Sequence, residues 1–204
     1  MRSFLLVANQ AVTRPFNLNG LPNAGRMDLA CRFLAQALCV SHGIREDVDA
    51  FLLLLGPPQP PRALLVRGGE VRTLSPDERN IGGIINKALS LSVLPAWRES
   101  SPGVYVAAKD LATLLDEHPG DIAYLVEDGE DIRETAGKLE GCLVVLGDHR
   151  GLEEEQEQLV RRRARYAVSV SPHALQADQC VTIVHYELDR AAEGPSEGKM
   201  SLSR

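Results

Sequence analysis

The stretch CLVVLGDHRG, Cys142–Gly151, contains the pattern that decides the fold: an apolar run followed directly by Gly147-Asp148-His149. A continuous apolar run without polar alternation is typical of a strand buried on both faces, as in parallel sheets covered by helices. We therefore expect a strand over Cys142–Leu146. Ligands bind beyond the carboxyl ends of such strands, so the Gly-Asp-His triplet is expected at a binding site.

The same pattern occurs twice more in the second half of the chain. A strand expected over Ile122–Val126 is followed by Glu127-Asp128-Gly129, and one over Ala167–Ser169 is followed by Ser171-Pro172-His173. The alternation is completed by a strand at Val104–Ala107 and by helices at Lys109–Glu117, Leu152–Arg163 and about Asp178–Asp189. Strands alternating with amphipathic helices predict an α/β fold with a parallel sheet, and a site built from the three strand-end loops.

The first half predicts strands at Ser3–Ala8 and Phe51–Leu55, and an irregular loop at Thr13–Gly25. A helix is expected over Met27–His42, with Gly43 as its C-terminal stop. Gly68-Gly69 predicts a hairpin that joins Ala63–Arg67 to Glu70–Leu74. Ser75-Pro76-Asp77-Glu78 has the form of a capping box, with Ser75 as the cap of a helix that ends near Leu89.

Length and composition favour one domain over residues 1–190, with a disordered tail over residues 191–204 that is rich in Gly, Ser and charge. The net charge of −6 argues against a protein that coats nucleic acid by charge alone. Residues 1–97 carry 10 Lys and Arg against 7 Asp and Glu, a net +3, whereas residues 98–204 carry 12 against 21, a net −9. An anionic partner is therefore expected to bind the first half.

Several classes of protein are disfavoured. No apolar run reaches the ~20 residues that a membrane helix needs, and the start resembles no signal peptide, so a cytoplasmic protein is expected. The four cysteines form no CxxC pair and the histidines lack ligand spacing, so no metal site is expected. GxGxxG and GxxxxGK[ST] are both absent, which disfavours dinucleotide and ATP binding.

Two other motifs have ordinary structural explanations. Asp148-His149 with Ser169, Ser171 or Cys180 could form a hydrolase site, but nothing resembles a GxSxG elbow, so a polar loop is favoured. The arginine cluster Arg161–Arg165 could bind RNA. Cations at the end of a helix also complement its dipole and pair with upstream glutamates, and this structural role is favoured.

Five segments together resemble the archaeal tRNA pseudouridine-54 N1-methyltransferase family, which has bacterial relatives. They are GRMDLACRFLAQALCVSHGIREDV (Gly25–Val48), SPDERNIGGIINKAL (Ser75–Leu89), YLVEDGEDI (Tyr124–Ile132), VVLGDHRG (Val144–Gly151) and SVSPHALQADQCVTIVHYELD (Ser169–Asp189). The resemblance spans nearly the whole chain before the tail. It implies the SPOUT fold, a parallel-rich α/β sheet with helices on both faces and a C-terminal trefoil knot, assembled as a homodimer.

The resemblance also implies the activity: methyl transfer from S-adenosyl-L-methionine (SAM) to N1 of pseudouridine, at position 54 of the tRNA T-arm. The SAM-binding positions carried over by motif are Leu125, Gly147, Val170, Ser171, Pro172, His173, Ala174, Leu175 and Cys180. Gly147 is expected to let the backbone approach the ligand closely.

The candidate side chains for contact with the RNA are chosen from the reaction chemistry and from the charge distribution along the chain. N1 of pseudouridine is a weakly acidic N–H, so a carboxylate could assist its loss, and Asp28 and Asp77 are the candidates to contact the base. Arg26, Arg79, Asn80 and Lys87, in the basic half, are the expected RNA contacts. Two alternatives stay open: a SPOUT methyltransferase for another nucleoside or for rRNA, and a non-catalytic dimer that binds RNA or a nucleotide.

Overall fold

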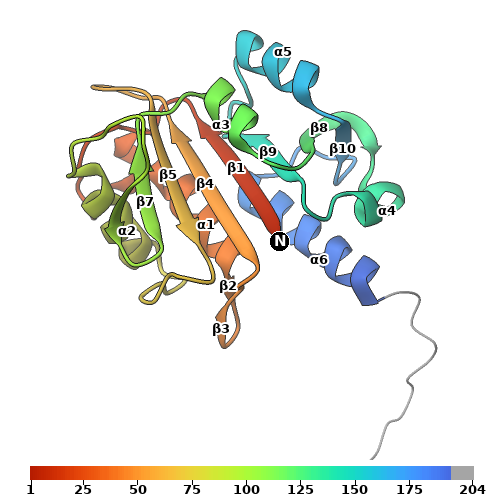
Figure 1. Cartoon of the computed structure of the whole chain (residues 1–204), viewed down its shortest axis with the longest axis horizontal. Coiled ribbons are helices and arrows are strands. Elements are labelled where there is room, and N and C mark those ends of the chain that lie inside the picture. Colours follow the sequence, from red (N-terminus) through yellow and green to blue (C-terminus); the bar gives the residue numbers. More distant parts are fainter. Residues whose placement is uncertain (194–204) are drawn as a thin grey trace, which may run out of the picture.

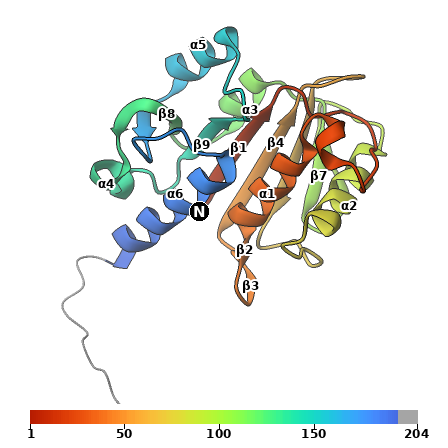
Figure 2. The same ribbon diagram turned by 180° about the vertical axis from the view of Figure 1, so that it is seen from behind.

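The first strand, β1 (Arg2–Ala8), lies inside the sheet because it is apolar toward both faces. Phe4, Leu6 and Ala8 belong to one buried cluster, and Leu5 and Val7 to a second on the opposite side. A strand with two buried faces needs a helical layer on each side. The computed structural model, which describes residues 1–193, has these two layers (Figures 1 and 2).

The main sheet has eight strands in the order β10-β8-β9-β1-β4-β5-β7-β6. The five strands from β10 to β4 pair in parallel, and β5, β7 and β6 continue the sheet with antiparallel pairs. The remaining bounds are β4 (Val48–Leu54), β5 (Arg62–Arg67), β6 (Arg98–Ser101), β7 (Val104–Ala107), β8 (Ile122–Asp131), β9 (Leu143–Gly147) and β10 (Tyr166–Ser169).

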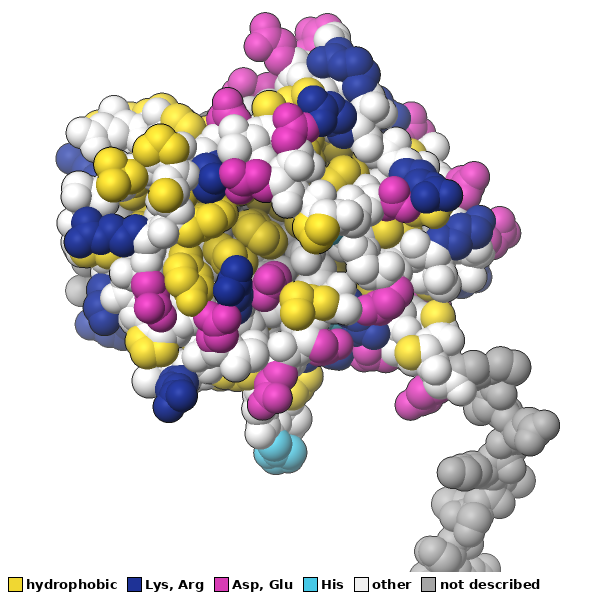
Figure 3. Space-filling model, in the orientation of Figure 1, with side chains coloured by type: hydrophobic (Ala, Val, Ile, Leu, Met, Phe, Trp, Pro, Cys, Tyr) yellow, Lys and Arg dark blue, Asp and Glu magenta, His cyan; other side chains and the backbone are white. Residues whose placement is uncertain are grey.

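Three helices, α1 (Met27–Leu38), α2 (Glu78–Leu89) and α6 (Ala177–Glu193), cover one face, with α1 between the other two (Figure 2). On the other face α3 (Leu111–Glu117) and α5 (Glu154–Arg163) cover the parallel part. Over the antiparallel part of that face, apolar side chains gather at the surface (Figure 3), including the partly exposed Phe51, Leu55 and Trp97. The link between β8 and β9 contains α4 (Ile132–Thr135) and the 3-10 helix η2 (Ala136–Lys138).

An interruption in the β8–β10 pairing positions the site. Ala167 pairs with Tyr124, but the next residue of β10, Val168, pairs with Glu130. The segment 125–129 of β8 therefore leaves the ladder with β10. Gly129 approaches β10 so closely that a Cβ atom there would lie 2.5 Å from the backbone nitrogen of Val168. Only glycine permits this close approach. Directly after Gly129, β8 rejoins the ladder with β10 at Glu130.

The predicted hairpin at Gly68-Gly69 is wrong. Residues 70–74 form no strand, and β5 instead pairs with β4 on one side and β7 on the other. A Cβ atom at Gly68 would lie 1.9 Å from the carbonyl oxygen of Arg45, so this glycine serves a close backbone approach. The strand predicted at Val104–Ala107 exists, but it is antiparallel and not part of the parallel sheet.

Three helix ends differ from the sequence-based expectation. α1 stops at Leu38, and Gly43 lies in a short β2–β3 ladder (Cys39–Val40 and Gly43–Ile44). The cap of α2 is Asp77, two residues later than predicted, because its carboxylate accepts the N–H of Asn80. α6 extends to Glu193, so residues 191–193 of the predicted tail are helical, and residues 194–204 lie outside the described residues.

The remaining predicted elements are found within a few residues of their expected bounds, and β8 is longer than expected. The sequence analysis did not predict the edge strand β6, the short α4 with η2, the β2–β3 ladder or the 3-10 helix η1 (Leu21–Ala24). Among residues 1–193, every helix is too short or too polar to cross a membrane.

Candidate functional site

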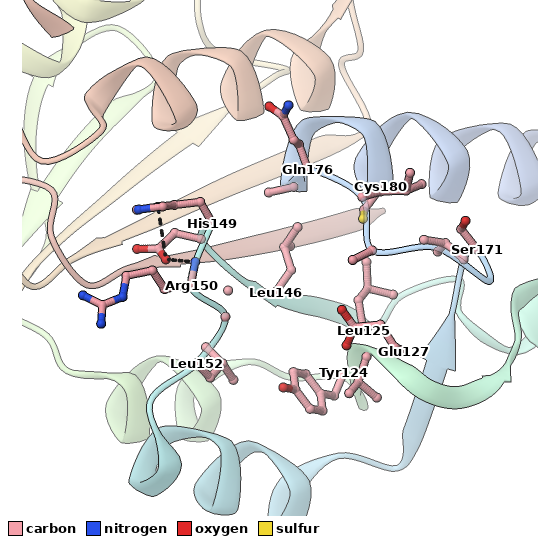
Figure 4. A pocket seen from close by; sticks show the side chains of 18 of the residues that line it. Tyr124, Leu125, Glu127, Leu146, His149, Arg150, Leu152, Ser171, Gln176 and Cys180 are labelled. Atoms are coloured by element: carbon pink, nitrogen blue, oxygen red, sulfur yellow. Dashed lines mark hydrogen bonds and ion pairs between the residues drawn. The ribbon is translucent and has the colours of Figure 1, made fainter. Parts of the chain in front are cut away.

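A cavity of about 610 Å³ opens where β8, β9 and β10 end and α6 begins. We call it the strand-end cavity. Leu125 from β8, Leu146 from β9 and Cys180 from α6 face one another across it (Figure 4). Each of the three predicted strand-end segments contributes to the lining, although Asp128 and Gly129 stay outside it. The position agrees with the rule that parallel sheets bind ligands at the carboxyl ends of their strands.

The structure brings together eight of the nine residues predicted to bind the cofactor. Those that line the cavity are Leu125, Gly147, Val170, Ser171, His173, Ala174, Leu175 and Cys180. Pro172 does not line it and instead faces a neighbouring hollow beside α4 and α6. The turn at Ser171 explains the difference: its hydroxyl accepts the backbone N–H of His173, which turns the chain at Pro172 away from the cavity.

The wall next to β9 is shaped by a tight loop over Gly147–Gly151. Asp148 shapes it from within, because its carboxylate accepts the backbone N–H groups of Asn9 and Arg150, both at 2.9 Å. A Cβ atom at Gly147 would lie 2.4 Å from the carbonyl carbon of Gly151. Glycine is thus needed here for the approach of two backbone segments. The expected close approach of its backbone to a ligand stays a prediction.

The hydrolase interpretation gains no support from this loop. The Asp148 carboxylate is 5% exposed and occupied by two backbone N–H groups, and its distance to Nδ1 of His149 is 3.6 Å. Such a distance is too long for a firm hydrogen bond. The loop therefore acts as a wall of the cavity and not as a catalytic dyad.

Two side chains of the lining, Cys180 on α6 and Tyr124 on β8, are uncharged at neutral pH. Burial raises the pKa of the Cys180 thiol to about 11, and it raises the pKa of Tyr124 to about 12. The guanidinium of Arg161 lies 5.4 Å from the centre of the Tyr124 ring and donates to Asp128 at 3.0 Å. At neutral pH the cavity thus presents an uncharged thiol and phenol beside its leucines.

Arg26 lines the cavity, and its backbone is strained. It is the N-cap of α1 with φ 64°, and Gly25 before it has φ 70°. Left-handed backbone at a non-glycine residue costs about 1–2 kcal/mol, and such residues cluster at functional sites. The guanidinium donates to both oxygens of Asp28, each at 3.0 Å. The fold therefore holds Arg26 at the cavity with a fixed orientation.

Asp28 is buried behind Arg26 as a charged carboxylate. Burial acts to raise the pKa of Asp28, but hydrogen bonds from Arg26 and then Arg32 outweigh it and hold the pKa below its usual value. Arg32 donates at 3.1 Å. A carboxylate fixed by two arginines is a weak proton acceptor, so the structure favours a role for Asp28 in orienting Arg26.

The other predicted RNA-side residues lie on α2. Asp77 caps the helix, and hydrogen bonds from the Ser75 hydroxyl and the Asn80 N–H lower its pKa. The side chain of Asn80 accepts the N–H of Ser75 at 3.0 Å, and Arg79 donates to Asn19 at 2.6 Å. Lys87 is exposed in the last turn. Asp77 does not line the strand-end cavity, and its contact with a base stays a prediction.

The arginines at the end of α5 are mostly paired. Arg161 donates to Glu157 as the helix spacing predicted, Arg163 pairs with Asp116, and Arg165 pairs with Asp121. These pairs agree with the structural interpretation of the cluster.

Sequence reasoning missed Gln176 as a cavity residue, and it assigned Arg26 to RNA alone. Gln176 directly follows the motif around Ser171, so its position along the chain was the available signal.

The chain matches known proteins over nearly its full length. A family model described as "Putative SAM-dependent RNA methyltransferase" matches residues 1–193. A protein of Methanococcoides burtonii is 41% identical over 202 residues, which cover 97% of this chain and 100% of that one. A protein of Methanopyrus kandleri is 42% identical over 204 residues, which cover 96% and 98% of the two chains. Both are named tRNA (pseudouridine(54)-N(1))-methyltransferase.

The fold also matches a solved structure. The crystal structure of Archaeoglobus fulgidus Nep1 bound to S-adenosylhomocysteine has a TM-score of 0.64 and 16% identity, and the match covers 94% of this chain and 98% of that one. This likeness confirms the predicted α/β fold class, while the trefoil knot stays a prediction. The cavity lies where that fold class was expected to bind its cofactor, and the family model spans every element that builds it. The chain belongs to this family of SAM-dependent RNA methyltransferases.

Proposed function

We propose that the protein transfers a methyl group from SAM to N1 of pseudouridine in tRNA, at position 54 of the T-arm. The observation that carries the proposal is the strand-end cavity, lined by eight of the nine residues predicted from the family motifs. The names of the relatives from M. burtonii and M. kandleri support the nucleoside, the position and the RNA.

The chemistry of the cavity suits SAM. Leu125, Leu146 and Leu175 offer an apolar slot for adenine, and the strand-end segments bring main-chain groups to its edge. The Glu127 carboxylate, also in the lining, would pair with the cationic or hydroxyl groups of the ligand. When bound, SAM supplies a methyl group already activated by its sulfonium, so the protein mainly has to align the acceptor and exclude water.

The protein's own residues then have to place the base. Methylation would form a bond between N1 and the methyl carbon as the bond from that carbon to the sulfonium sulfur breaks, with S-adenosylhomocysteine as the leaving group. The N1 proton would leave to water or to a carboxylate. We propose that Arg26, oriented by Asp28, contacts the RNA at the opening of the cavity. Arg79 and Lys87 on α2 contact phosphates, and Asp77 and Asn80 keep the start of that helix in place.

Methyl transfer to matched RNAs tests the reaction. A T-arm transcript with pseudouridine at position 54 and the same transcript with uridine are incubated with SAM and the protein, and nucleosides are analysed by mass spectrometry. The equivalent atom in uridine is a C–H, and sites built for an N–H reject its loss by up to ~10⁴–10⁵. We expect methylation of the pseudouridine RNA alone.

The alternatives give different results in the same assay. Equal methylation of both RNAs would leave a SPOUT methyltransferase for another nucleoside. Methylation of ribosomal RNA alone would indicate an rRNA enzyme. Binding of S-adenosylhomocysteine and RNA without any transfer would indicate a non-catalytic binding protein. A single protein preparation under one set of conditions thus separates the competing classes.

We propose in addition that the protein is a homodimer and acts in the cytoplasm. Support comes from the family resemblance and from the hollow of about 630 Å³ behind segment 169–172, which includes Ile132, Pro172 and Ile183. Its lining also includes Asp131, Arg133 and Glu187, so both apolar and charged side chains of a second copy would pack into it. Light scattering at micromolar concentration should give twice the mass of the chain, and a strict monomer would contradict the dimer.

A further inference from the structure

One arginine on α1 contacts both helices that flank α1. The side chain of Arg32, 31% exposed, donates from Nη1 to Glu78 at 3.4 Å and from Nη2 to Gln176 at 3.2 Å. Its Nε lies 3.7 Å from a carboxylate oxygen of Asp178, and Asp28 accepts from it on α1 itself. Because α1 lies between α2 and α6 (Figure 2), a single guanidinium connects the starts of both helices.

Each of these contacts leads to a different part of the proposed reaction. Gln176 lines the strand-end cavity and directly precedes α6, which also supplies Cys180. Glu78 is the first residue of α2 and stands between Asp77, the cap, and Arg79, a proposed RNA contact. Arg32 itself does not line the cavity. It therefore lies between the cofactor region and the RNA region without belonging to either.

The charges explain why an arginine is needed. Three carboxylates, those of Asp28, Glu78 and Asp178, contact this one guanidinium. Without it they would repel one another, and the starts of α2 and α6 would lose their common partner. A guanidinium has five donors in a fixed plane and can serve several acceptors at once, whereas a lysine ammonium acts as a single compact charge.

We propose that Arg32 is a positioning residue that couples cofactor binding to RNA binding. A ligand in the cavity restricts the motion of Gln176. Because Arg32 donates to both Gln176 and Glu78, the start of α2 becomes more ordered as well. Less free energy is then needed to order Arg79 and its neighbours when RNA binds, so the RNA binds more tightly. The inference rests on the proposed function, because it needs both SAM and RNA as ligands.

The coupling is measured as a ratio of dissociation constants. The Kd for the T-arm RNA is determined with and without saturating S-adenosylhomocysteine, for the wild type, Arg32→Gln and Arg45→Gln. Couplings of this kind usually exceed about 5-fold, and we expect at least that in the wild type and about 2-fold or less in Arg32→Gln. Arg45→Gln is the matched control, since Arg45 pairs with Asp189 at the far end of α6, and it should keep the wild-type ratio.

Each other outcome decides against the proposal. A wild type without coupling, or an Arg32→Gln variant that retains it, would overturn the role of Arg32. If Arg32→Gln does not fold, Glu78→Ala breaks only the contact with α2 at a side chain that is 45% exposed, and the ratio should again fall. A wild type that binds no S-adenosylhomocysteine would contradict the proposed function itself, and this result is seen before any RNA is added.

Discussion

The strand-end cavity and the helical layer behind the sheet are held in shape by different interactions. The cavity depends on close backbone approaches, at Gly147 to Gly151 and at Gly129 to Val168. In the layer, arginine–carboxylate pairs of Arg32 join the helices, and a pair of Arg45 joins the loop after β3 to α6. A backbone approach tolerates no added atom, whereas a half-exposed ion pair contributes about 1 kcal/mol or less. Substitutions should therefore act abruptly in the cavity and gradually behind the sheet.

The largest effect is expected for Gly147→Val. A Cβ atom there would lie 2.4 Å from the backbone of Gly151, so the loop must move and the cavity wall with it. Overpacking of this kind costs up to about 3 kcal/mol, and we expect S-adenosylhomocysteine to bind about 100-fold more weakly by calorimetry. Gly137→Val is the control, because that position has open space, and it should bind like the wild type. Equal affinity of both variants would show that the backbone does not set the cavity.

The second largest effect is expected for the pH dependence of stability, through the buried His185 of α6. His185 is 3% exposed, its Nε2 lies 3.0 Å from the carbonyl of Ala37, and burial lowers its pKa to about 4. Between pH 4 and 6.5 the unfolded chain binds a proton at this position that the folded chain does not. The free energy of unfolding should therefore fall as pH decreases through that window, by up to about 3 kcal/mol from this group.

Urea unfolding at pH 7 and pH 4.5 measures this dependence. His185→Gln should show a smaller loss of stability than the wild type between the two pH values, because Gln keeps a donor for Ala37 and does not titrate. The carboxylates titrate in both proteins and cancel from the difference. If both proteins lose the same free energy, then His185 is not the group responsible.

The difference between the strand-end cavity and the helical layer also explains which features could be predicted from the sequence and which could not. The three strand-end segments were found because a strand with two buried faces is a continuous apolar run, and the site follows from the strand ends. The contact between Gly147 and Gly151 could not be predicted, because the two backbone segments meet only in the folded loop. Gly68-Gly69 has the composition of a hairpin turn, but close approach to Arg45 selects glycine there instead.

The ion pairs behind the sheet were beyond sequence reasoning for a different reason. Arg32 and Gln176 are 144 residues apart, and many arginines of the chain could have paired with either segment. Helical spacing predicted only local pairs, such as Arg161 with Glu157. The cap of α2 was placed at Ser75 because Ser and Asp both cap helices, and only the fold shows that Asp77 does so.

A smaller effect is expected for Arg79→Ala on the surface of α2. Its guanidinium is exposed and donates to Asn19, so its loss should leave the fold and the affinity for S-adenosylhomocysteine unchanged. If Arg79 contacts a phosphate, RNA binds severalfold more weakly, and the slope of log K against log salt falls by about 0.7–0.9. Arg98→Ala on the edge strand β6 is the control, and an equal change of slope in both variants would contradict the assignment.

The smallest effect is expected at Cys180, although it lines the same cavity as Gly147. Because burial raises the pKa of its thiol to about 11, Cys180 is uncharged between pH 6 and 9 and acts as a small apolar side chain. Cys180→Ala removes one atom that a bound ligand would cover, worth about 0.8 kcal/mol, so S-adenosylhomocysteine should bind about fourfold more weakly. The thiol should contribute no pH dependence to the affinity in that range, and the wild type and Cys180→Ala should have parallel profiles. A loss of 100-fold, as expected for Gly147→Val, would mean that a side chain and not the backbone approach controls the cavity, and the contrast between the two regions would fail.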